Sequence, residues 1–239
     1  MQLTKATVDL LKNFSTINGS ILVKAGTKLE TISATKNILP SADVSETFET
    51  QFGIYDLNEF LNLATSEAFI GADLQFQEKS VVLKNGRSRS RYYYADPSTI
   101  ISPVKMLVMP DINVRVKISS DDLKRIKSMS SILGKNDFTI SGVDDEIIMS
   151  VSDKKDPTTN NFEMNIAKFD ESDVYESFSM SMKMENLKLI GGDYIVNLAE
   201  ARDSEGKGTG VGVAHFVNSS VPVEYYIAMV EALYGSKRT

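Results

Sequence analysis

The stretch LTKATVDLLKNFSTI at residues 3–17 decides how the fold begins, because its apolar side chains recur with the period of an α-helix. Counted from the first leucine, they stand at i, i+3, i+7, i+11 and i+14, which is one face of a helix. These residues are Leu3, Ala6, Leu10, Phe14 and Ile17. The turn signal Asn18-Gly19 and a short apolar run follow. The sequence therefore predicts an amphipathic helix that leads through a tight turn into a strand.

Three further segments show the helical period. They are residues 55–64, with Asp56 as the N-cap, residues 119–133, with Ser119 or Ser120 as the N-cap, and residues 184–190, which stop at Gly191. Most of the remaining chain carries short runs rich in Val, Ile, Tyr and Phe, many of which alternate apolar and polar residues, as antiparallel strands with one solvated face do. The predicted strands are residues 21–24, 46–54, 75–84, 90–95, 138–141, 147–152, 161–169, 194–199, 211–217 and 223–230.

The order of these elements repeats. Each half of the chain runs helix, several strands, helix, several strands, with the helices near residues 5, 57, 122 and 185. Between the halves lie three of the six prolines, Pro97, Pro103 and Pro110, and neither a helical nor an alternating pattern. Proline fixes φ and removes a hydrogen-bond donor, so this stretch is interpreted as an extended connector. We predict an α+β fold with two similar domains at residues 1–96 and 111–239, joined by a linker at residues 97–110.

Composition excludes several classes of function. The 239 residues carry a formal net charge of −6, with no cysteine and a single histidine, His215. Disulfide frameworks, thiolate nucleophiles, cysteine-based zinc sites and multi-histidine metal centres are therefore excluded. The acidic balance argues against a protein that coats nucleic acid with its whole surface, although it allows one basic face. The absence of an apolar run of about 18 residues and of a basic, apolar leader predicts neither membrane insertion nor secretion.

Positive charge collects on the predicted helices although the whole chain is acidic. With residues placed about 100° apart, Lys5 and Lys12 of the first helix lie within about 20° of each other, opposite the apolar stripe. The cations of the other helical segments are Lys124, Arg125, Lys127 and either Lys183 or Lys188. The helix at residues 55–64 is the exception and carries none. Such charge favours a phosphate-facing surface, but lysine on the wet face of an amphipathic helix is also ordinary in water-soluble proteins.

A second basic feature consists of Arg87, Arg89 and Arg91, which are spaced by two and therefore predicted on one face of a strand. Three interpretations stay open for them. They could contact phosphates, protect an exposed sheet edge, or pair with acidic residues across an interface.

Signals of enzymatic chemistry are weak. The run GKGTG at residues 206–210 lacks the first glycine and the Ser/Thr of a phosphate-binding Walker motif and leads into a strand pattern, which favours a hairpin loop. Acidic residues at 121–122 and 144–146 suit a helix N-terminus and a turn better than a metal site. A hydrolase that uses them with a divalent ion is an alternative. His215 lies in an apolar strand, which favours a structural role.

Several stretches resemble the sliding clamps of T4-like bacteriophages, the DNA polymerase processivity factors. The resemblance is carried by LLKNFSTINGS at 10–20, IYDLNEFL at 54–61, ADPSTI at 95–100 and MENLKLIGGDY at 184–194, in the same order along almost the whole chain. Residues 27–50 and 135–175 match poorly. The resemblance implies two similar clamp domains per chain and a closed homotrimer, with helices lining the ring and antiparallel sheets outside.

The resemblance also implies roles for individual residues. The DNA-facing residues would be Lys5, Lys12, Lys124, Arg125, Lys127 and Lys188. The last strand of the first domain, residues 88–95, would pair with residues 161–169 of the next copy. The residues assigned to this interface are Arg87, Arg89, Arg91, Tyr92, Tyr94, Phe162, Glu163 and Met164. A pocket for the apolar tails of partners is assigned to Leu107, Met109, Pro222 and Tyr225.

The function implied by the resemblance is to encircle duplex DNA without reading its sequence and to tether the replicative polymerase. The expected partners are duplex DNA, the phage DNA polymerase, an ATP-driven clamp loader, late-transcription factors and other copies of the chain. No catalytic residue, metal or cofactor is expected, and the place of action would be the cytoplasm of the host bacterium. The alternative from another class is a β-rich structural protein of the virion that tethers nothing to DNA.

Overall fold

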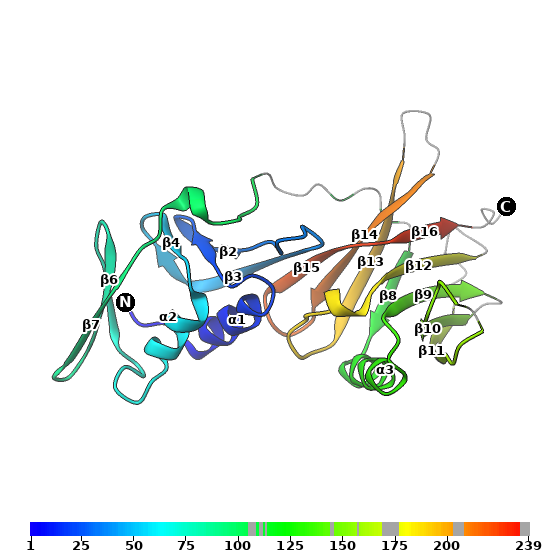
Figure 1. The fold of residues 1–239 in the computed structure, drawn as a ribbon, viewed down its shortest axis with the longest axis horizontal. Helices are drawn as coiled ribbons and strands as arrows, with labels where there is room; N and C mark the ends of the chain where they lie inside the picture. Colours follow the sequence, from blue (N-terminus) through cyan, green and yellow to red (C-terminus); the bar gives the residue numbers. More distant parts are fainter. Residues whose placement is uncertain are drawn as a thin grey trace. The chain divides into compact units, whose positions relative to one another are not determined.

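A computed structural model describes residues 1–104, 109, 112, 114–143, 146–156, 158–168, 177–202 and 208–234 of the chain. The chain divides into two compact units, Met1–Met106 and Leu107–Thr239, and each combines helix with antiparallel strands. Figure 1 shows the order of the elements along the chain. Among the described residues, no helix has the length and apolar character needed to cross a membrane.

Among its described residues, the first unit contains two α-helices and seven strands. Strand β1 pairs with β4, β2 pairs with β3, and β5, β6 and β7 form an antiparallel sheet in which β7 pairs with β6 alone among the described residues. The helices are α1 (Lys5–Ser15) and α2 (Leu57–Ala64). The strands are β1 (Ile21–Val23), β2 (Gly26–Glu30), β3 (Ile38–Phe48), β4 (Phe52–Ile54), β5 (Asp73–Phe76), β6 (Ser80–Asn85) and β7 (Ser88–Tyr93).

Both helices of this unit begin as the sequence predicts. The Thr4 side chain caps α1 by accepting from the Thr7 amide, and the Asp56 side chain caps α2 by accepting from the Glu59 amide at 2.9 Å. The apolar stripe of α1 is buried at Leu10 and Phe14, whereas Ala6 is exposed. Helix α1 packs against α2, so the two helices share one core.

The predicted linker starts inside the first unit. A short 3₁₀ turn, η1 (Pro97–Thr99), is capped by Asp96, and Ile100 behind it is buried. The Asn18 side-chain amide donates to the carbonyl of Ile101 at 3.0 Å. Residues 97–104 therefore belong to the first unit, although proline content alone predicts that the extended connector begins at residue 97.

In the part of the second unit that the structure describes, there are one α-helix and nine strands. An antiparallel sheet runs in the order β11-β10-β9-β12-β16, and a second runs β15-β14-β13-β8. The helix is α3 (Ser120–Leu133), capped by Ser119 and ended by Gly134, whose φ of 64° suits glycine. The strands are β8 (Val114–Ile118), β9 (Asp137–Val143), β10 (Glu146–Ser152), β11 (Phe162–Lys168), β12 (Phe178–Lys183), β13 (Tyr194–Arg202), β14 (Gly208–Asn218), β15 (Val223–Ala228) and β16 (Glu231–Tyr234).

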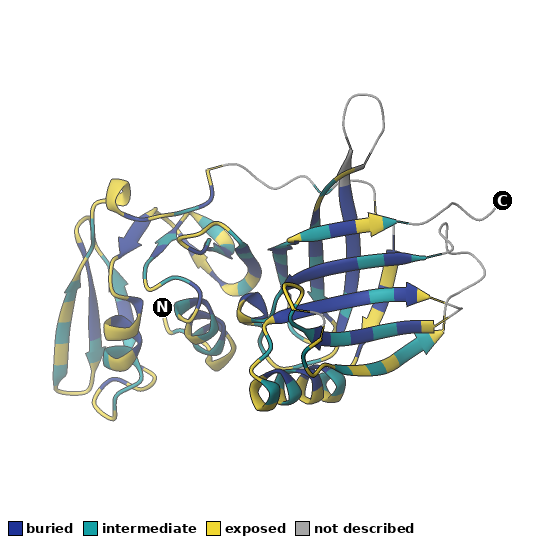
Figure 2. Cartoon of the chain, turned by 45° about the vertical axis from the view of Figure 1, so that its right-hand side comes forward, coloured by how far each residue is buried: buried dark blue, intermediate teal, exposed yellow. Residues whose placement is uncertain are grey.

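Burial alternates along β10, β14 and β15, as a strand with one face on the core requires. Along β10, Ile147, Met149 and Val151 are buried while the residues between them are partly accessible (Figure 2). The same alternation buries Ala214 and Phe216 in β14, whereas residues 196–200 of β13 are all buried. One face of β10, β14 and β15 therefore packs on the core, while both faces are covered along much of β13 and in the middle of β9 and β12.

The prediction of a fourth α-helix is wrong. Residues 184–190 form only a three-residue 3₁₀ turn, η2 (Met184–Asn186). Tertiary hydrogen bonds occupy the backbone groups that a helix would use: the Ile190 amide donates to the Tyr225 hydroxyl at 3.1 Å, and the Tyr194 hydroxyl donates to the Ile190 carbonyl at 2.6 Å. The apolar period is real, since Leu187 is buried, but the segment packs without helical bonding.

Most predicted strands are confirmed, although local sequence patterns do not reveal β2, β8, β12, β16 and most of β3. In β3, Pro40 and the polar residues around it resemble a loop. In β12, serines alternate with the buried Phe178, Met180 and Met182, which weakens the apolar signal. The single strands predicted at 46–54 and 75–84 are each interrupted by a turn between two strands, and neither turn contains the glycine or proline that usually marks one.

Candidate DNA-facing surface and subunit edges

The solvent side of α1 carries the two lysines predicted to face DNA. Both Lys5 and Lys12 are exposed, and the Lys5 ammonium pairs with the Asp9 carboxylate one turn on at 2.5 Å. Because this pair is exposed, solvent screens it and it contributes little to stability. The lysines line a groove of about 430 Å³ whose apolar part includes Phe69 and Ile70. The wet face of α2 presents no cation, since Asn58, Glu59 and Asn62 are its exposed residues.

The solvent side of α3 carries Lys124 and Arg125, both exposed. The Lys124 ammonium lies 3.1 Å from the Asp121 carboxylate. Lys127 differs from them because it is half-buried, and loss of hydration lowers the pKa of its ammonium. Lys127 is therefore the least exposed of the predicted DNA-facing cations.

Lys188 is exposed but does not lie on a helix. It follows η2 in the irregular segment that leads to β13, so its predicted place on a helical face is wrong. The described structure thus places the helical cations on α1 and α3, the first helix of each unit. Contact between any of these residues and DNA stays a prediction.

The side chains of the edge strand β7 alternate between an exposed face and a partly buried face. Arg89 and Arg91 are exposed, and neither forms an ion pair with another described residue. Tyr92 points the other way: its hydroxyl donates to the Asp56 carbonyl at 3.0 Å and its ring lies 5.4 Å from that of Phe60.

Tyr94 and Arg87, on either side of this strand, also differ in burial. Tyr94 stacks on Phe52 with ring centroids 5.0 Å apart, and burial raises the pKa of its hydroxyl to about 12. Arg87 is exposed but lies outside the strand. It belongs to the two-residue turn that joins β6 to β7, where Gly86 takes a φ of 56°, so the prediction that all three arginines share one strand is wrong for Arg87.

The second edge strand, β11, pairs only with β10 among the described residues. Its side chains also alternate between an exposed and a partly buried face along residues 162–165. Phe162 is opposite Val151 and Met164 is opposite Met149, both of which are buried. Glu163 lies on the open face, opposite Ser150. The eight residues predicted for a subunit interface thus separate into an apolar set beside the cores and a charged set on the outside.

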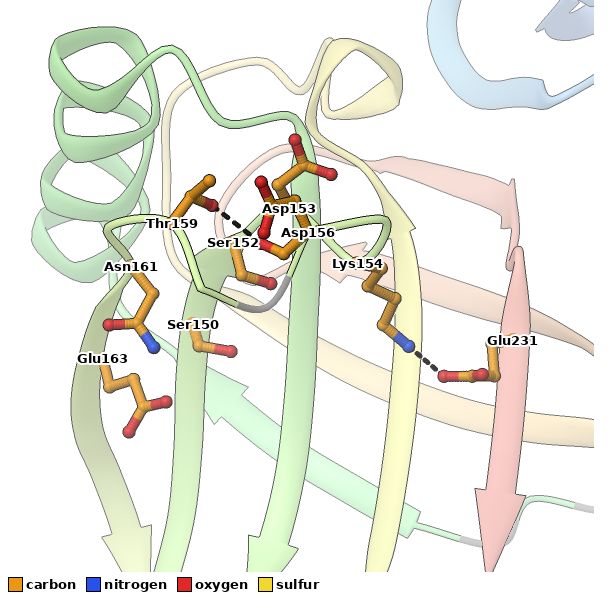
Figure 3. Close-up of a pocket in the computed structure, with 9 residues that line it drawn as sticks. All are labelled: Ser150, Ser152, Asp153, Lys154, Asp156, Thr159, Asn161, Glu163 and Glu231. Carbon is orange, nitrogen blue, oxygen red and sulfur yellow. Dashed lines mark hydrogen bonds and ion pairs between the residues drawn. The ribbon is translucent and has the colours of Figure 1, made fainter.

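A polar hollow of about 460 Å³ lies beside β11 on this open face (Figure 3). Lys154 forms an ion pair with Glu231, and the Asp156 side chain accepts hydrogen bonds from the Thr158 amide and hydroxyl. These bonds hold the pKa of the Asp156 carboxyl below its usual value. The residues that line the hollow are Ser150, Ser152, Asp153, Lys154, Asp156, Thr159, Asn161, Glu163 and Glu231.

The predicted pocket for partner peptides is only partly described. Leu107 lies outside the described residues, Met109 is half-buried and Pro222 is exposed. Tyr225 is completely buried, and burial raises the pKa of its hydroxyl, which accepts from the Ile190 amide. A visiting side chain cannot touch Tyr225 unless its neighbours move, so Met109 and Pro222 are the two of the four predicted residues that are both described and accessible.

The residues considered for enzymatic chemistry have structural partners. His215 lies 2.8 Å from the Glu224 carboxylate through Nε2 and stacks on Tyr226 at 4.4 Å. The Asp122 carboxylate accepts from the Ser119 hydroxyl at the start of α3. No group of three or more potential metal ligands occurs among the described residues, and residues 144–145 and 206–207 lie outside them.

Comparisons with protein families match both units. Residues 4–102 match the family described as DNA polymerase processivity factor, and residues 115–232 match the family described as gp45 sliding clamp, C terminal. The sliding clamp of Vibrio phage KVP40 is 30% identical over 239 residues, covering 98% of this chain and 100% of the relative. The sliding clamp of Escherichia phage RB69 is 27% identical and covers 96% of each chain.

Solved structures show the same fold at low sequence identity. The PCNA of A. fulgidus, solved with the C-terminal region of FEN-1 bound, superimposes with a TM-score of 0.65 at 10% identity over 98% of each chain. PCNA from Entamoeba histolytica gives a TM-score of 0.63 at 13% identity, covering 95% of this chain and 97% of that structure. These likenesses confirm the predicted α+β class with two clamp domains per chain.

Proposed function

The chain belongs to the sliding clamps of T4-like bacteriophages, the DNA polymerase processivity factors, and from this premise we propose that three copies close into a ring around duplex DNA. Members of this family are processivity factors and not enzymes. In the proposed ring, the clamp tethers the phage polymerase to its template inside the host bacterial cytoplasm. An ATP-driven loader would open the ring, and late-transcription factors would bind the ring as a second class of partner.

The observation that carries the proposal is that, among the described residues, each unit has a sheet-end strand that pairs with one neighbour only. Strand β7 ends one sheet of the first unit and β11 ends one sheet of the second. Exposed edges invite pairing with another chain. Because the two edges are unlike, each copy would offer β7 to the β11 of the next, and such head-to-tail contacts generate a ring when the rotation closes. This joint would use Arg87, Arg89, Arg91, Tyr92, Tyr94, Phe162, Glu163 and Met164.

The proposed mechanism is topological. Duplex DNA carries about one charge per 1.7 Å, so a ring roughly 20 Å thick would surround about twelve phosphates. A few long lysines would attract these charges without reading bases, which permits sliding, and the closed ring would prevent dissociation. The cations proposed for this surface are Lys5, Lys12, Lys124 and Arg125, with smaller contributions from Lys127 and Lys188.

The partner pocket is proposed beside residues 107–109, with Met109 and Pro222 accessible and Tyr225 behind them. Methionine adapts to ligands of several shapes, which suits a site that serves several partners in turn.

The test combines ring formation with loading. Light scattering at micromolar concentration is expected to report a trimer, and electron microscopy a particle with a hole of duplex width. On long circular templates, the protein is expected to raise polymerase processivity only when loader and ATP are present. Equal stimulation without loader would contradict topological loading. A trimer that binds neither DNA, loader nor polymerase would instead support a structural protein of the virion.

Charge reversal separates the DNA-facing surface from the joint. K5E/K12E/K124E is expected to impair loading and sliding while the trimer persists, because these side chains lie on helices and not on the edge strands. The control K28E/K36E/K117E changes the net charge equally from positions on strands and turns. Loss of the trimer in the first variant alone would show that the helix lysines are structural.

A further inference from the structure

Each of the two edge strands carries charged side chains on its exposed face. In β7, Tyr92 lies on the buried face, opposite the fully buried Val81, while Arg89 and Arg91 alternate with it on the exposed face. In β11, Phe162 and Met164 occupy the buried face, while Glu163 is exposed. Each strand thus has a side turned toward the core, named here the apolar side although Ser88 and Ser90 share it with Tyr92 in β7. The exposed, charged side also carries Tyr93 in β7 and Asn165 and Lys168 in β11.

The pleat of a continuous sheet dictates which of these sides meet. If β7 of one copy joins β11 of the next, the apolar sides must align, because the opposite arrangement would place Tyr92 and Phe162 on different faces and turn one of them to water. Alignment of the apolar sides brings Arg89 and Arg91 to the same side as Glu163. This consequence holds for parallel and antiparallel pairing, since the faces alternate in both.

The side that receives the arginines is acidic and concave. The hollow beside β11 is lined by four carboxylates and a single lysine, Lys154, which already pairs with Glu231 (Figure 3). Asp153 lies 4.0 Å from the Lys135 ammonium, whereas Asp156 and Glu163 form no ion pair with any described residue. The hollow therefore has spare negative charge.

We propose that Arg89 and Arg91 of one copy enter the hollow of the next copy and pair there with Glu163 and Asp156. This inference rests on the proposed ring. We call these ion pairs the charged lock. The lock adds to the apolar seam, which is the contact of Tyr92 in one copy with Phe162 and Met164 in the next. A guanidinium presents a planar fork of donors that matches a carboxylate in two-point contact, so arginine suits such a lock better than lysine. The occupant is a second copy of the chain, because the same molecule carries both complementary surfaces.

The lock makes ring closure sensitive to salt. Exposed ion pairs are screened as the Debye length falls from about 10 Å at 0.1 M salt to about 3 Å at 1 M. The apolar seam of Tyr92, Phe162 and Met164 is not weakened by the same change. Added salt is therefore expected to dissociate the trimer in part, and removal of the arginines is expected to abolish most of that dependence.

The experiment measures assembly of the full chain by sedimentation and mass photometry across a salt series. R89E/R91E is expected to weaken association between copies about tenfold or more at low salt, since each reversal turns attraction into repulsion. The matched control K24E/K36E alters the net charge by the same amount at exposed sites outside β7 and β11 and is expected to stay trimeric. R89Q/R91Q tests the lock without introducing repulsion.

The decisive variant exchanges the charges within one chain. R89E/R91E combined with D156R/E163R is expected to restore both the trimer and its salt dependence. Failure of this exchange in a chain that still melts cooperatively would overturn the pairing. A wild-type trimer that R89E/R91E leaves unchanged would also overturn it, while the ring would stand. A wild-type protein that is monomeric throughout would instead refute the ring itself.

One further outcome concerns another occupant of the hollow. Calorimetry with magnesium or calcium chloride alone on the wild-type protein is expected to show no binding that D156R/E163R removes. Such binding would mean that the carboxylates serve a cation, and the lock would be refuted.

Discussion

The described residues of the first unit form two α-helices, whereas those of the second form α3 and the short turn η2 where the order of elements predicts another helix. Both short elements bury a leucine to the same extent, since Leu61 in α2 and Leu187 directly after η2 are each 3% exposed. The second element of each unit therefore contributes a buried leucine whether or not its backbone forms α-helical hydrogen bonds. Tertiary partners, chiefly Tyr225 and Tyr194, satisfy the backbone of the second unit instead.

The two units also distribute charge alike. The first helix of each carries exposed cations, Lys5 and Lys12 on α1 and Lys124 and Arg125 on α3, while the wet face of α2 carries none. The first helix of each unit is therefore the main proposed contact with DNA, and the second element is chiefly an anchor. The following predictions test these two roles.

The largest expected effect on stability comes from Leu61 and Leu187, the buried leucines that anchor α2 and η2. Leu61→Ala and Leu187→Ala are each expected to lower the free energy of unfolding by about 3 kcal/mol, because both remove a buried side chain and leave a cavity. Urea denaturation of the two variants measures this directly. Leu63→Ala, at a half-buried position of α2, is the control and should cost clearly less. A loss below about 1 kcal/mol for Leu187→Ala would show that the turn is not an anchor equivalent to α2.

The next effect tests why η2 stops after one turn. Tyr225→Phe removes the hydroxyl that accepts from the Ile190 amide and leaves a backbone donor without that partner. The expected cost is about 1–3 kcal/mol, since an unmade buried hydrogen bond costs the desolvation of the remaining group. Amide hydrogen exchange at Ile190 should accelerate in the same variant. Tyr55→Phe, at an exposed site, is the control, and equal stability losses for both would contradict the explanation.

The sequence predicts the helices α1, α2 and α3 well because their caps and apolar stripes are local signals. It fails at η2 because Tyr225 lies far along the chain, and no local pattern reveals a hydrogen bond to Ile190. It misses β3 and β12 because Pro40 and alternating serines resemble a loop, although pairing with other strands decides the structure there. Sheet edges are also beyond local patterns: the alternation of Arg89 and Arg91 predicts a strand face, but only the pairing shows that β7 is an edge.

A smaller effect concerns how the first helix of each unit is attached. The Glu46 carboxylate accepts from the Thr4 amide and the Thr7 hydroxyl, both at 2.5 Å, at the start of α1, whereas exposed Asp193 accepts from the Ser120 amide at 2.7 Å at the start of α3. Burial alone would raise the pKa of Glu46, but these hydrogen bonds outweigh it and hold the pKa below 4.5. Glu46→Gln is expected to cost about 1 kcal/mol at pH 7, and Asp193→Asn less.

The pH dependence of this effect has a defined sign. Because the folded pKa of Glu46 is depressed, the unfolded chain binds its proton more readily, so the stabilisation is complete above pH 4.5 and is lost as the pH falls through the lower folded pKa. The stability difference between wild type and Glu46→Gln should therefore shrink in acid. Thermal denaturation between pH 7 and strongly acidic buffer measures it, and a difference that grows in acid would refute the role of the carboxylate.

The smallest expected effect comes from adding the missing cation to α2. Asn58→Lys places a charge on an exposed helical face that carries none, without touching an anchor. If α2 faces the duplex beside α1, one additional phosphate contact should steepen the dependence of log K on log salt by about 0.9, a modest change in a ring that topology already retains. The measurement is the rate at which loaded clamps slide off the ends of linear DNA at several salt concentrations. Thr35→Lys, in an exposed turn, supplies the same charge elsewhere. If both variants slide at the wild-type rate while Lys12→Glu slides faster, then α1 approaches the DNA and α2 does not, and the division between contact helix and anchor helix becomes sharper.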